Sequence, residues 1–389
     1  MKRSILLIVI LLMCSAVVHA KELSVKDYGA IGDGKADETA AFQKAVAATP
    51  QGGQIRVPAG KYRINGTLEL KMVTLIGADA GSWVGDNPGL PTLLPESTSG
   101  PCVRLLASGA VHGLGFEYNW QGKEPSALPA CIELAGIGNR VSDCKIFNAW
   151  DGIMADGKTN VGRALVQNCF IVDVHNIGVR MTGTWDVSWI SKVEVWSPGS
   201  KRFLSKGVGF LLGKNDILNL SDCFAFSAQT GYKLVESIEG AKISGVTWAT
   251  FSNCTSDFCG IGMEVDGAHT ISIAGGTHWT HHNGLSIKGK GGQVRISGCE
   301  FASNGGAAVD ISGGKVVTMA GCQFRRESTS FDAPALRITG GEAIAVSGCV
   351  MTSATKALDV DKSLKSVVLT GNVVKENVRP EATPQTPAP

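Results

Sequence analysis

A block of about seven residues recurs along most of the chain, and this repeat is the feature that most restricts the fold. Each copy alternates apolar and polar residues and places a cysteine or another small or apolar residue at its fourth position. Successive copies lie about 23 to 30 residues apart, a period typical of solenoids, whose stacked repeats share one core. The aligned fourth positions are Leu114, Cys144, Cys169, Val193, Cys223, Val246, Gly276, Cys299, Cys322, Cys349 and Asn372.

A second set of segments lies between these blocks and alternates strictly, as in GVRMT from Gly178 and GLSIK from Gly284. Alternation is typical of a strand with one face turned inward. Two or three strands per turn, with no helical pattern between them, predict an all-β fold, a single-stranded right-handed parallel β-helix over residues 21–378. The side chains expected to point outward from the second set are Arg104, Glu133, Met154, Arg180, Leu211, Lys233, Glu264, Ser286, Asp310, Arg337 and Asp359.

The two ends of the chain differ from the repeat. A basic start (MKR), a short apolar run and small residues ending at Ala20 predict a signal peptide over residues 1–20. We therefore expect a secreted or periplasmic protein with no membrane-inserted segment after cleavage. Residues 379–389, rich in Pro and Thr, predict a disordered tail.

Ten cysteines follow the predicted signal peptide, and six of them occupy the repeat position. Side chains on neighbouring turns are held at the strand spacing of ~4.8 Å, a little beyond the usual Cβ separation of a disulfide. Buried free thiols are therefore expected for most of them. The best disulfide candidates are Cys254 with Cys259, followed by Cys102 with Cys131.

The glycine-rich stretch DYGAIGDGKADETAAFQKAV, from Asp27, predicts a cap for the coil. A helix is expected over residues 37–49 with Asp37 as its N-cap. Phe42, Ala45 and Val46 give this helix one apolar face. It would cover the open end of the solenoid, whose exposed strand edges otherwise invite aggregation.

This stretch, with the following GGQIRVPAGKYRING and LELKMVTLIGAD, resembles the N-terminal segment of the pectate lyase superfamily. The type is that of rhamnogalacturonases and epimerases, also seen in polygalacturonase-like enzymes and phage tailspikes. The resemblance covers residues 27–78, and the repeat in the rest of the chain agrees with it. It implies a pectin-lyase-like right-handed β-helix that acts on acidic or neutral polysaccharides, but fold alone indicates the reaction type only weakly.

The blocks NAWDG and HHNGLSIKG are similar in form to the catalytic blocks of polygalacturonase-type glycosidases. Asp151 matches the first aspartate, but Trp150 replaces the threonine before it, and His175-Asn176 stands where that family has two aspartates. The second carboxylate pair that inverting hydrolysis needs is therefore not supplied.

A lyase instead needs a base for the C5 proton, cations for the uronate carboxylate and a proton donor. His175 or His282 is the predicted base, and Arg180 and Lys233 are the predicted carboxylate clamp. Glu264 lies one turn from Lys233, ~5 Å away at the backbone, either as an acid/base group or in a surface salt bridge.

Further residues are predicted to bind substrate. Trp150, Trp185 and Trp189 carry flat rings that can stack on sugars, although core packing explains some tryptophans equally well. Asn176 and Lys288 lie beside the predicted catalytic groups. His278, His281 and His282 are expected on a loop that leads into the strand at residues 284–288, with His281 facing the substrate.

No metal or other cofactor is predicted. His-x-x-His-His is not a zinc spacing, and Ca²⁺, which some pectate lyases use, needs clustered carboxylates that the outward column lacks. The net charge of +2 does not suggest a nucleic-acid partner.

The sequence thus predicts a secreted polysaccharide-active enzyme, first a lyase acting on a uronate-containing, pectin-like polymer. A polygalacturonase-like hydrolase and a non-catalytic glycan-binding or structural β-helix remain as alternatives. A monomer and a homotrimer are both compatible with the sequence.

Overall fold

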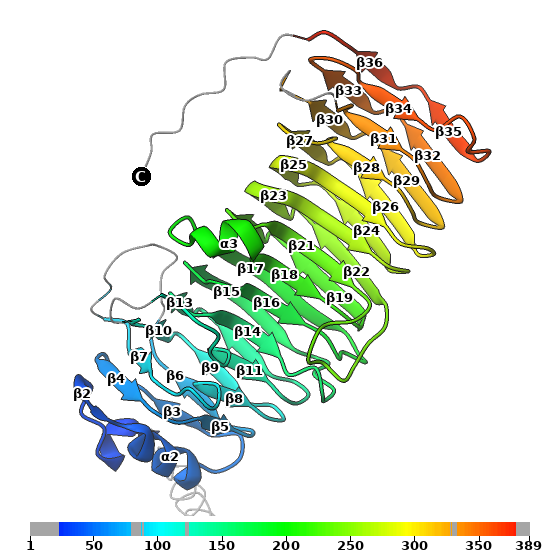
Figure 1. Cartoon of the computed structure of the whole chain (residues 1–389). Coiled ribbons are helices and arrows are strands. Elements are labelled where there is room, and N and C mark those ends of the chain that lie inside the picture. Colours follow the sequence, from blue (N-terminus) through cyan, green and yellow to red (C-terminus); the bar gives the residue numbers. More distant parts are fainter. Residues whose placement is uncertain are drawn as a thin grey trace, which may run out of the picture.

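The chain coils into a parallel β-helix in the computed structural model, which describes residues 23–78, 87, 89–120, 124–326, 328 and 333–378 (Figure 1). Strands pair in parallel with strands one turn earlier and one turn later, so that three long sheets form. The predicted all-β solenoid is confirmed. The predicted signal peptide and C-terminal tail lie outside the described residues.

Sheet A contains the strands of the second sequence set, together with the second halves of two long strands. Its strands are β5 (Leu68–Leu70), β8 (Val103–Leu105), β11 (Ile132–Leu134), β14 (Asp151–Ala155), β16 (Ile177–Met181), β18 (Val208–Leu212), β21 (Thr230–Val235), β23 (Thr255–Asp266), β25 (Thr277–Lys288), β28 (Val309–Ile311), β31 (Leu336–Ile338) and β34 (Leu358–Val360).

Sheet B follows sheet A in every turn and includes the first halves of two further long strands. Its strands are β1 (Leu23–Ser24), β3 (Gln54–Arg56), β6 (Thr74–Ile76), β9 (Ala110–His112), β12 (Arg140–Ser142), β15 (Leu165–Val172), β17 (Ser188–Trp196), β19 (Asn215–Ser221), β22 (Thr247–Ser252), β24 (Thr270–Ala274), β26 (Gln293–Ser297), β29 (Val316–Ala320), β32 (Ala343–Ser347) and β35 (Val367–Thr370).

Sheet C completes the turn and takes the second halves of β15 and β17 and the first halves of β23 and β25. Its other strands are β2 (Asp33–Asp37), β4 (Lys61–Ile64), β7 (Thr92–Pro95), β10 (Gly115–Glu117), β13 (Lys145–Phe147), β20 (Phe224–Phe226), β27 (Glu300–Ser303), β30 (Gln323–Arg326), β33 (Val350–Ser353) and β36 (Val373–Lys375).

Helix α2 (Thr39–Ala48) lies across the N-terminal end of the coil, after a short 3-10 helix η1 (Val25–Tyr28) (Figure 1). Its own residues Phe42 and Ala45 face the coil and are buried, as predicted. The predicted N-cap is wrong by one residue, because the cap position is Glu38. Asp37 ends β2, and its Oδ1 still accepts a hydrogen bond from the Thr39 N–H (3.0 Å).

Glycines explain how the middle turns, from Gly152 to Gly284, pass sharply from sheet C into sheet A. A Cβ added to Gly231 would lie 2.7 Å from the carbonyl oxygen of Gly262, and one added to Gly262 would lie 2.5 Å from that of Gly284. Real Cβ atoms do not approach backbone oxygens so closely, so this corner excludes side chains. From Gly152 to Gly284, the glycine at the start of each segment of the second set therefore reflects close strand packing at the corner.

Seven cysteines form an interior column at the repeat position, one more than the sequence alignment predicted. Leu220 on β19 pairs with Phe251 on β22, which aligns Cys223 with Cys254. The assignment of Val246 to this column is therefore wrong, because Val246 lies before β22 begins.

All ten described cysteines are free and buried. The predicted Cys254–Cys259 disulfide is absent, because both cysteines are free thiols. Cys102 and Cys131 do face each other on neighbouring turns, since Val103 pairs with Ile132, but they remain thiols.

His278 belongs to the core, which corrects its predicted place on a surface loop. It lies on β25, is fully buried, stacks on Phe301 (ring centroids 5.2 Å apart) and shares a hydrogen bond between its Nδ1 and Ser256 Oγ (2.9 Å). The continuous strand over residues 277–288 replaces the predicted loop. Burial lowers the pKa of His278 to about 4.

We expect His278 to make the fold acid-sensitive. In the unfolded chain a histidine titrates near 6.5, so the unfolded state binds the proton more readily, and the free energy of unfolding falls as the pH drops from about 6.5 to about 4. Between pH 7 and pH 5, protonation of this histidine in the unfolded chain should lower the free energy of unfolding by about 2 kcal/mol. His278→Phe should remove that part of the pH dependence in denaturant unfolding, whereas exposed His282→Phe should leave it unchanged; equal pH dependence in both variants contradicts this account.

Candidate functional site

The strand register confirms the column of sheet A residues that the alternation predicted, but its members Met154, Leu211, Glu264 and Ser286 are buried. Arg180 on β16 pairs with Leu211 on β18, Leu211 with Lys233 on β21, and Lys233 with Glu264 on β23. The pairing of the neighbouring strands extends the same column in both directions. Side chains of successive turns are therefore presented at a spacing of ~4.8 Å along one face.

Asp151 begins β14, at the corner where sheet C passes into sheet A. Its Oδ1 accepts hydrogen bonds from Asn176 Nδ2 (2.9 Å) and from the backbone N–H of Ile177 (3.0 Å). Burial raises the pKa of Asp151 to about 6, against the lowering effects of the Asn176 hydrogen bond and the positive charge of Arg180. A carboxyl group that titrates near 6 can donate and recover a proton in mildly acidic solution.

Arg180 supplies a fixed cation beside this carboxyl group. Its Nε and Nη2 donate to the carbonyl oxygen of Ala155 (3.0 and 2.7 Å), which holds the guanidinium plane in place. Burial lowers the pKa of Arg180 and the charge of Asp151 raises it. An arginine stays protonated in such a setting, so the group remains a cation.

His175 is held by its neighbours on both sides. Its Nε2 lies 2.8 Å from Asn148 Oδ1 and its Nδ1 lies 2.9 Å from Ser200 Oγ, and the side chain is only 8% exposed. Because Asn148 Oδ1 can only accept, the proton sits on Nε2 and Nδ1 accepts from the Ser200 hydroxyl. Burial and the positive charge of Arg202 lower the pKa of His175. These contacts give His175 a positioning role, and the predicted base function gains no support from them.

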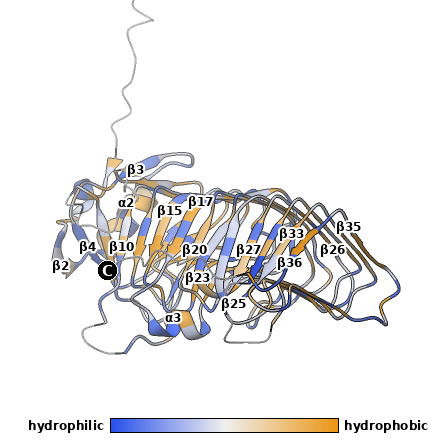
Figure 2. Ribbon diagram, turned by 90° about the horizontal axis from the view of Figure 1, so that it is seen from above, coloured by the Kyte–Doolittle hydropathy of each residue, from blue (hydrophilic) through white to orange (hydrophobic). Residues whose placement is uncertain are grey.

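Helix α3 (Lys201–Lys206) contributes a residue that sequence reasoning missed. The helix lies on the outside of the coil beside β20 and β23, as Figure 2 shows. The guanidinium carbon of Arg202 lies 4.6 Å from the centre of the Trp150 ring, and the charge of Arg202 acts on Asp151 and His175. Ser200, which accepts a hydrogen bond from Phe203 N–H, could have indicated the helix start, but no local signal places Arg202 against Trp150.

A second charged group lies farther along sheet A. The Glu264 carboxylate, 8% exposed, lies 3.4 Å from Lys233 Nζ and 3.1 Å from Lys288 Nζ. The predicted neighbours are thus in contact, with Lys288 as an additional partner. β23 is four strand spacings from β14, so Glu264 lies ~19 Å along the coil from Asp151. The structure therefore separates the predicted catalytic residues: Lys233 and Glu264 are in contact, and Asp151 and Arg180 lie ~19 Å from them along the coil.

His281 and His282 lie near neither Asp151 nor Arg180, because β25 is five strand spacings, ~24 Å, from β14. His281 packs edge-on against Phe258, with ring centroids 5.5 Å apart. Burial lowers the pKa of His281, and it raises that of nearby Asp257. His282 is exposed.

The three predicted tryptophans do not lie together either. Trp150 lies next to Asp151 under Arg202. Trp189 lies on β17 in sheet B, and Trp185 lies in the turn that precedes it, with Lys214 Nζ 5.4 Å from its ring centre. Trp185 and Trp189 are therefore on another face of the coil from the sheet A column.

Within the residues that the structure describes, no cluster of three or more His, Cys, Asp or Glu side chains could hold a metal ion. The same part of the chain contains no helix long and apolar enough to cross a membrane.

Comparisons with known proteins agree with this architecture. Residues 23–84 match the family model "Rhamnogalacturonase A/epimerase, pectate lyase-like", and residues 239–381 match the model "Right handed beta helix region". The A-module of a mannuronan C-5 epimerase from Azotobacter vinelandii superposes with a TM-score of 0.59 over 93% of this chain and 98% of that module, at 16% identity. The chain is thus a right-handed parallel β-helix protein with a pectate lyase-like N-terminal segment.

Its curated relatives include rhamnogalacturonases. A probable rhamnogalacturonase B of Aspergillus fumigatus is 23% identical over 301 residues, which cover 74% of this chain and 49% of the relative. Rhamnogalacturonase A of Aspergillus aculeatus is 23% identical over 300 residues, which cover 75% of this chain and 60% of the relative. The chain therefore spans about half the length of the relatives it matches.

We expect His175→Ala to lower stability, because it leaves Asn148 Oδ1 and Ser200 Oγ without their partner. The free energy of unfolding should fall by about 2–4 kcal/mol. His282→Ala, at an exposed histidine, should change it by less than about 0.5 kcal/mol. Denaturant unfolding of both variants measures the difference. A His175→Ala protein with full stability and no activity would instead assign this residue to proton transfer.

Proposed function

We propose that the chain is a secreted enzyme that cleaves a uronate-containing, pectin-like polysaccharide, and that cleavage occurs at Asp151. The observation that carries the proposal is the raised pKa of Asp151, about 6, at the corner between sheets C and A, where the positive charge of Arg180 acts on it. The similarity to rhamnogalacturonases over about three quarters of the chain supports a pectic substrate. Secretion rests on the predicted signal peptide.

Asp151 is the proposed proton donor. Breaking a glycosidic bond requires protonation of the leaving oxygen, both in hydrolysis and in elimination. The partly buried carboxyl group keeps its proton into mildly acidic solution, and the hydrogen bonds from Asn176 and Ile177 fix the orientation of Oδ1. Asp151 thereby has a pKa suited to proton donation and a carboxyl group of fixed orientation.

Cations on the same face are the proposed binding groups for uronate carboxylates. Arg180 and Arg202 both act on Asp151, and Lys233 and Lys288 flank Glu264 farther along sheet A. A polymer lying along this face would meet the two groups ~19 Å apart, so both can contact one chain. Guanidinium groups suit planar carboxylates because they can donate two hydrogen bonds at once.

Hydrolysis is the route that we favour over elimination. Elimination needs a base at C5, but both ring nitrogens of His175 are already engaged, and His282 is ~24 Å away along the coil. For hydrolysis, Glu264 is too distant to pair with Asp151, since inverting enzymes hold their carboxyl groups about 6.5–9.5 Å apart. Glu124, whose negative charge acts on His175, is the proposed partner carboxylate. Elimination remains the second candidate, because the face is rich in cations.

Asp151→Asn tests the proposal. The wild-type rate should fall as the pH rises past about 6, because the donor loses its proton, and the variant should lose activity at least about 100-fold. A folded-state pKa above the unfolded value means that ionised Asp151 destabilises the fold at neutral pH, so the variant should be as stable as the wild type or more stable. Asp222→Asn, at an exposed surface aspartate, is the matched control.

Product analysis on polygalacturonate and rhamnogalacturonan separates the routes. New reducing ends without unsaturated, ultraviolet-absorbing ends support hydrolysis, and unsaturated ends support elimination. An Asp151→Asn protein with wild-type activity, or no cleavage of either polymer by the wild type, contradicts the proposed function. In the second case, retention on immobilised polymer would identify a glycan-binding protein instead.

Arg202→Gln should weaken binding of a charged polymer. Loss of one charge-assisted contact should raise KM on polygalacturonate about tenfold, with a smaller rise on its methyl-esterified form, whose carboxylates are masked. Lys201→Gln, on the same helix, is the control and should change KM little. An equal effect of Arg202→Gln on both polymers would show that the residue does not recognise the carboxylate.

A further inference from the structure

Four large apolar side chains are exposed together on sheet B and in the turn before it, away from the face of Asp151. Trp185 is 49% exposed, Trp189 40%, Ile217 56% and Trp248 56%. We call them the tryptophan patch. Buried neighbours along the strands, such as Ile190 beside Trp189, show that the alternation turns these side chains outward. Isolated exposed apolar residues need no explanation, but a group of three indoles does.

The strand register places the members of the patch on successive turns. Trp189 on β17 pairs with Asn219 on β19, and Asn219 pairs with Thr250 on β22, two residues after Trp248. The rings of Trp189 and Trp248 are thus two strand spacings apart, ~10 Å along the coil. Asn219 Oδ1 accepts a hydrogen bond from Thr250 Oγ1 (2.7 Å), so hydrogen-bonding side chains lie among the rings.

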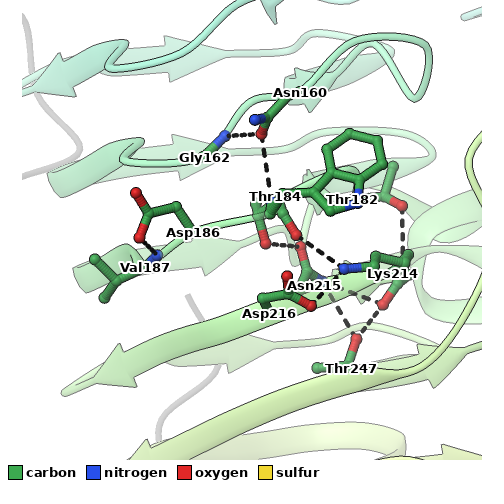
Figure 3. Close-up of polar contacts among 12 residues, drawn as sticks. Asn160, Gly162, Thr182, Thr184, Asp186, Val187, Lys214, Asn215, Asp216 and Thr247 are labelled. Carbon is green, nitrogen blue, oxygen red and sulfur yellow. Dashed lines mark hydrogen bonds and ion pairs between the residues drawn. The ribbon is translucent and has the colours of Figure 1, made fainter.

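Trp185 is fixed in place from two directions. Its backbone N–H donates to Asn160 Oδ1 (3.3 Å), and Lys214 Nζ lies 5.4 Å from its ring centre. Figure 3 shows Lys214 directed toward Asp216 and the Thr184 carbonyl, with Asn160 on the neighbouring turn. The backbone of Trp185 is thus anchored to the neighbouring turn, and its ring keeps an exposed face on which a ligand can stack.

The charges that border the patch cancel in pairs. Lys214 is paired with Asp216, and Arg163 Nε lies 2.6 Å from Asp186 Oδ2. The sheet A face, in contrast, carries charged groups around Asp151 and around Glu264, among them Arg180, Lys233 and Lys288. A surface of rigid indoles and amide or hydroxyl groups, with no net charge, is complementary to an uncharged ligand that offers both apolar faces and hydroxyl groups.

We propose that the tryptophan patch is a second carbohydrate-binding site, which takes a neutral glycan chain running along the axis of the coil. Trp189 and Trp248 stack on the apolar faces of its sugars, and Asn219 and Thr250 bond to its hydroxyl groups. The site lies on another sheet from Asp151. This inference goes beyond the proposed function and does not depend on it.

Binding by the full chain to soluble β-1,4-galactan and α-1,5-arabinan tests the proposal, measured by tryptophan fluorescence and by retardation in gels containing the glycan. The Asp151→Asn background prevents cleavage during the measurement. Trp189→Ala with Trp248→Ala should weaken binding of at least one neutral glycan about tenfold or more, and the two Phe replacements should retain most of it. Trp279→Phe, on sheet C, is the control. Made with Asp151 intact, the alanine variant should still cleave short charged substrates at the wild-type rate.

Three results would overturn the proposal. The first is equal binding of the neutral glycans by the alanine variant and the wild type, and the second is no binding of either glycan by the wild type. The third is self-association in sedimentation that disappears in the alanine variant, which would make the patch a protein interface. Loss of cleavage by Asp151→Asn bears only on the proposed function, so the two tests fail separately.

Discussion

Parallel pairing of each strand with its counterparts one turn away is the constraint on which the rest of the structure depends. It holds equivalent residues at a spacing of ~4.8 Å, so one residue type at one repeat position becomes a continuous column. A slip of one residue would turn every inward side chain outward, and the buried columns therefore fix the register. The same register that builds the core also determines which polar groups share the outer face of sheet A.

The candidate site uses departures from this regularity. Asp151 lies at a corner, where the chain leaves sheet C, and α3 is an insertion between β17 and β18 that the coil accommodates without a change in strand pairing. Corners can carry such insertions because the pairing of the strands on either side continues unchanged. Arg180 comes from a regular strand of sheet A, Asp151 from the corner before β14, and Arg202 from the insertion. Together they place a carboxyl group, whose pKa burial raises, among fixed cations.

Periodicity accounts for the part of the structure that could be predicted from the sequence. The outward column from Arg104 to Asp359 and the interior cysteines could be read from alternation, because strand geometry alone determines them. Contacts between turns of unequal length could not be predicted from alternation. For this reason the alignment placed Val246 in the cysteine column, where the structure has Cys254. His278 was misplaced because β25 continues through a segment that carries polar residues, and nothing local indicates that one imidazole turns inward. Arg202 depends on a tertiary contact with Trp150, which no repeat pattern encodes.

The interior column of thiols has a consequence for how the protein is made. Burial contributes to the raised pKa of Cys169 and Cys223 in this column, and it raises the pKa of Cys102 and Cys259 outside it, so these four thiols are poor nucleophiles once the coil has closed. Before closure the same sulfurs are accessible, and in an oxidising compartment each could form a wrong bridge that blocks stacking. Correct assembly in such a compartment therefore requires that the coil folds faster than its thiols are oxidised. Once the coil has formed, burial keeps oxidants away from the thiols.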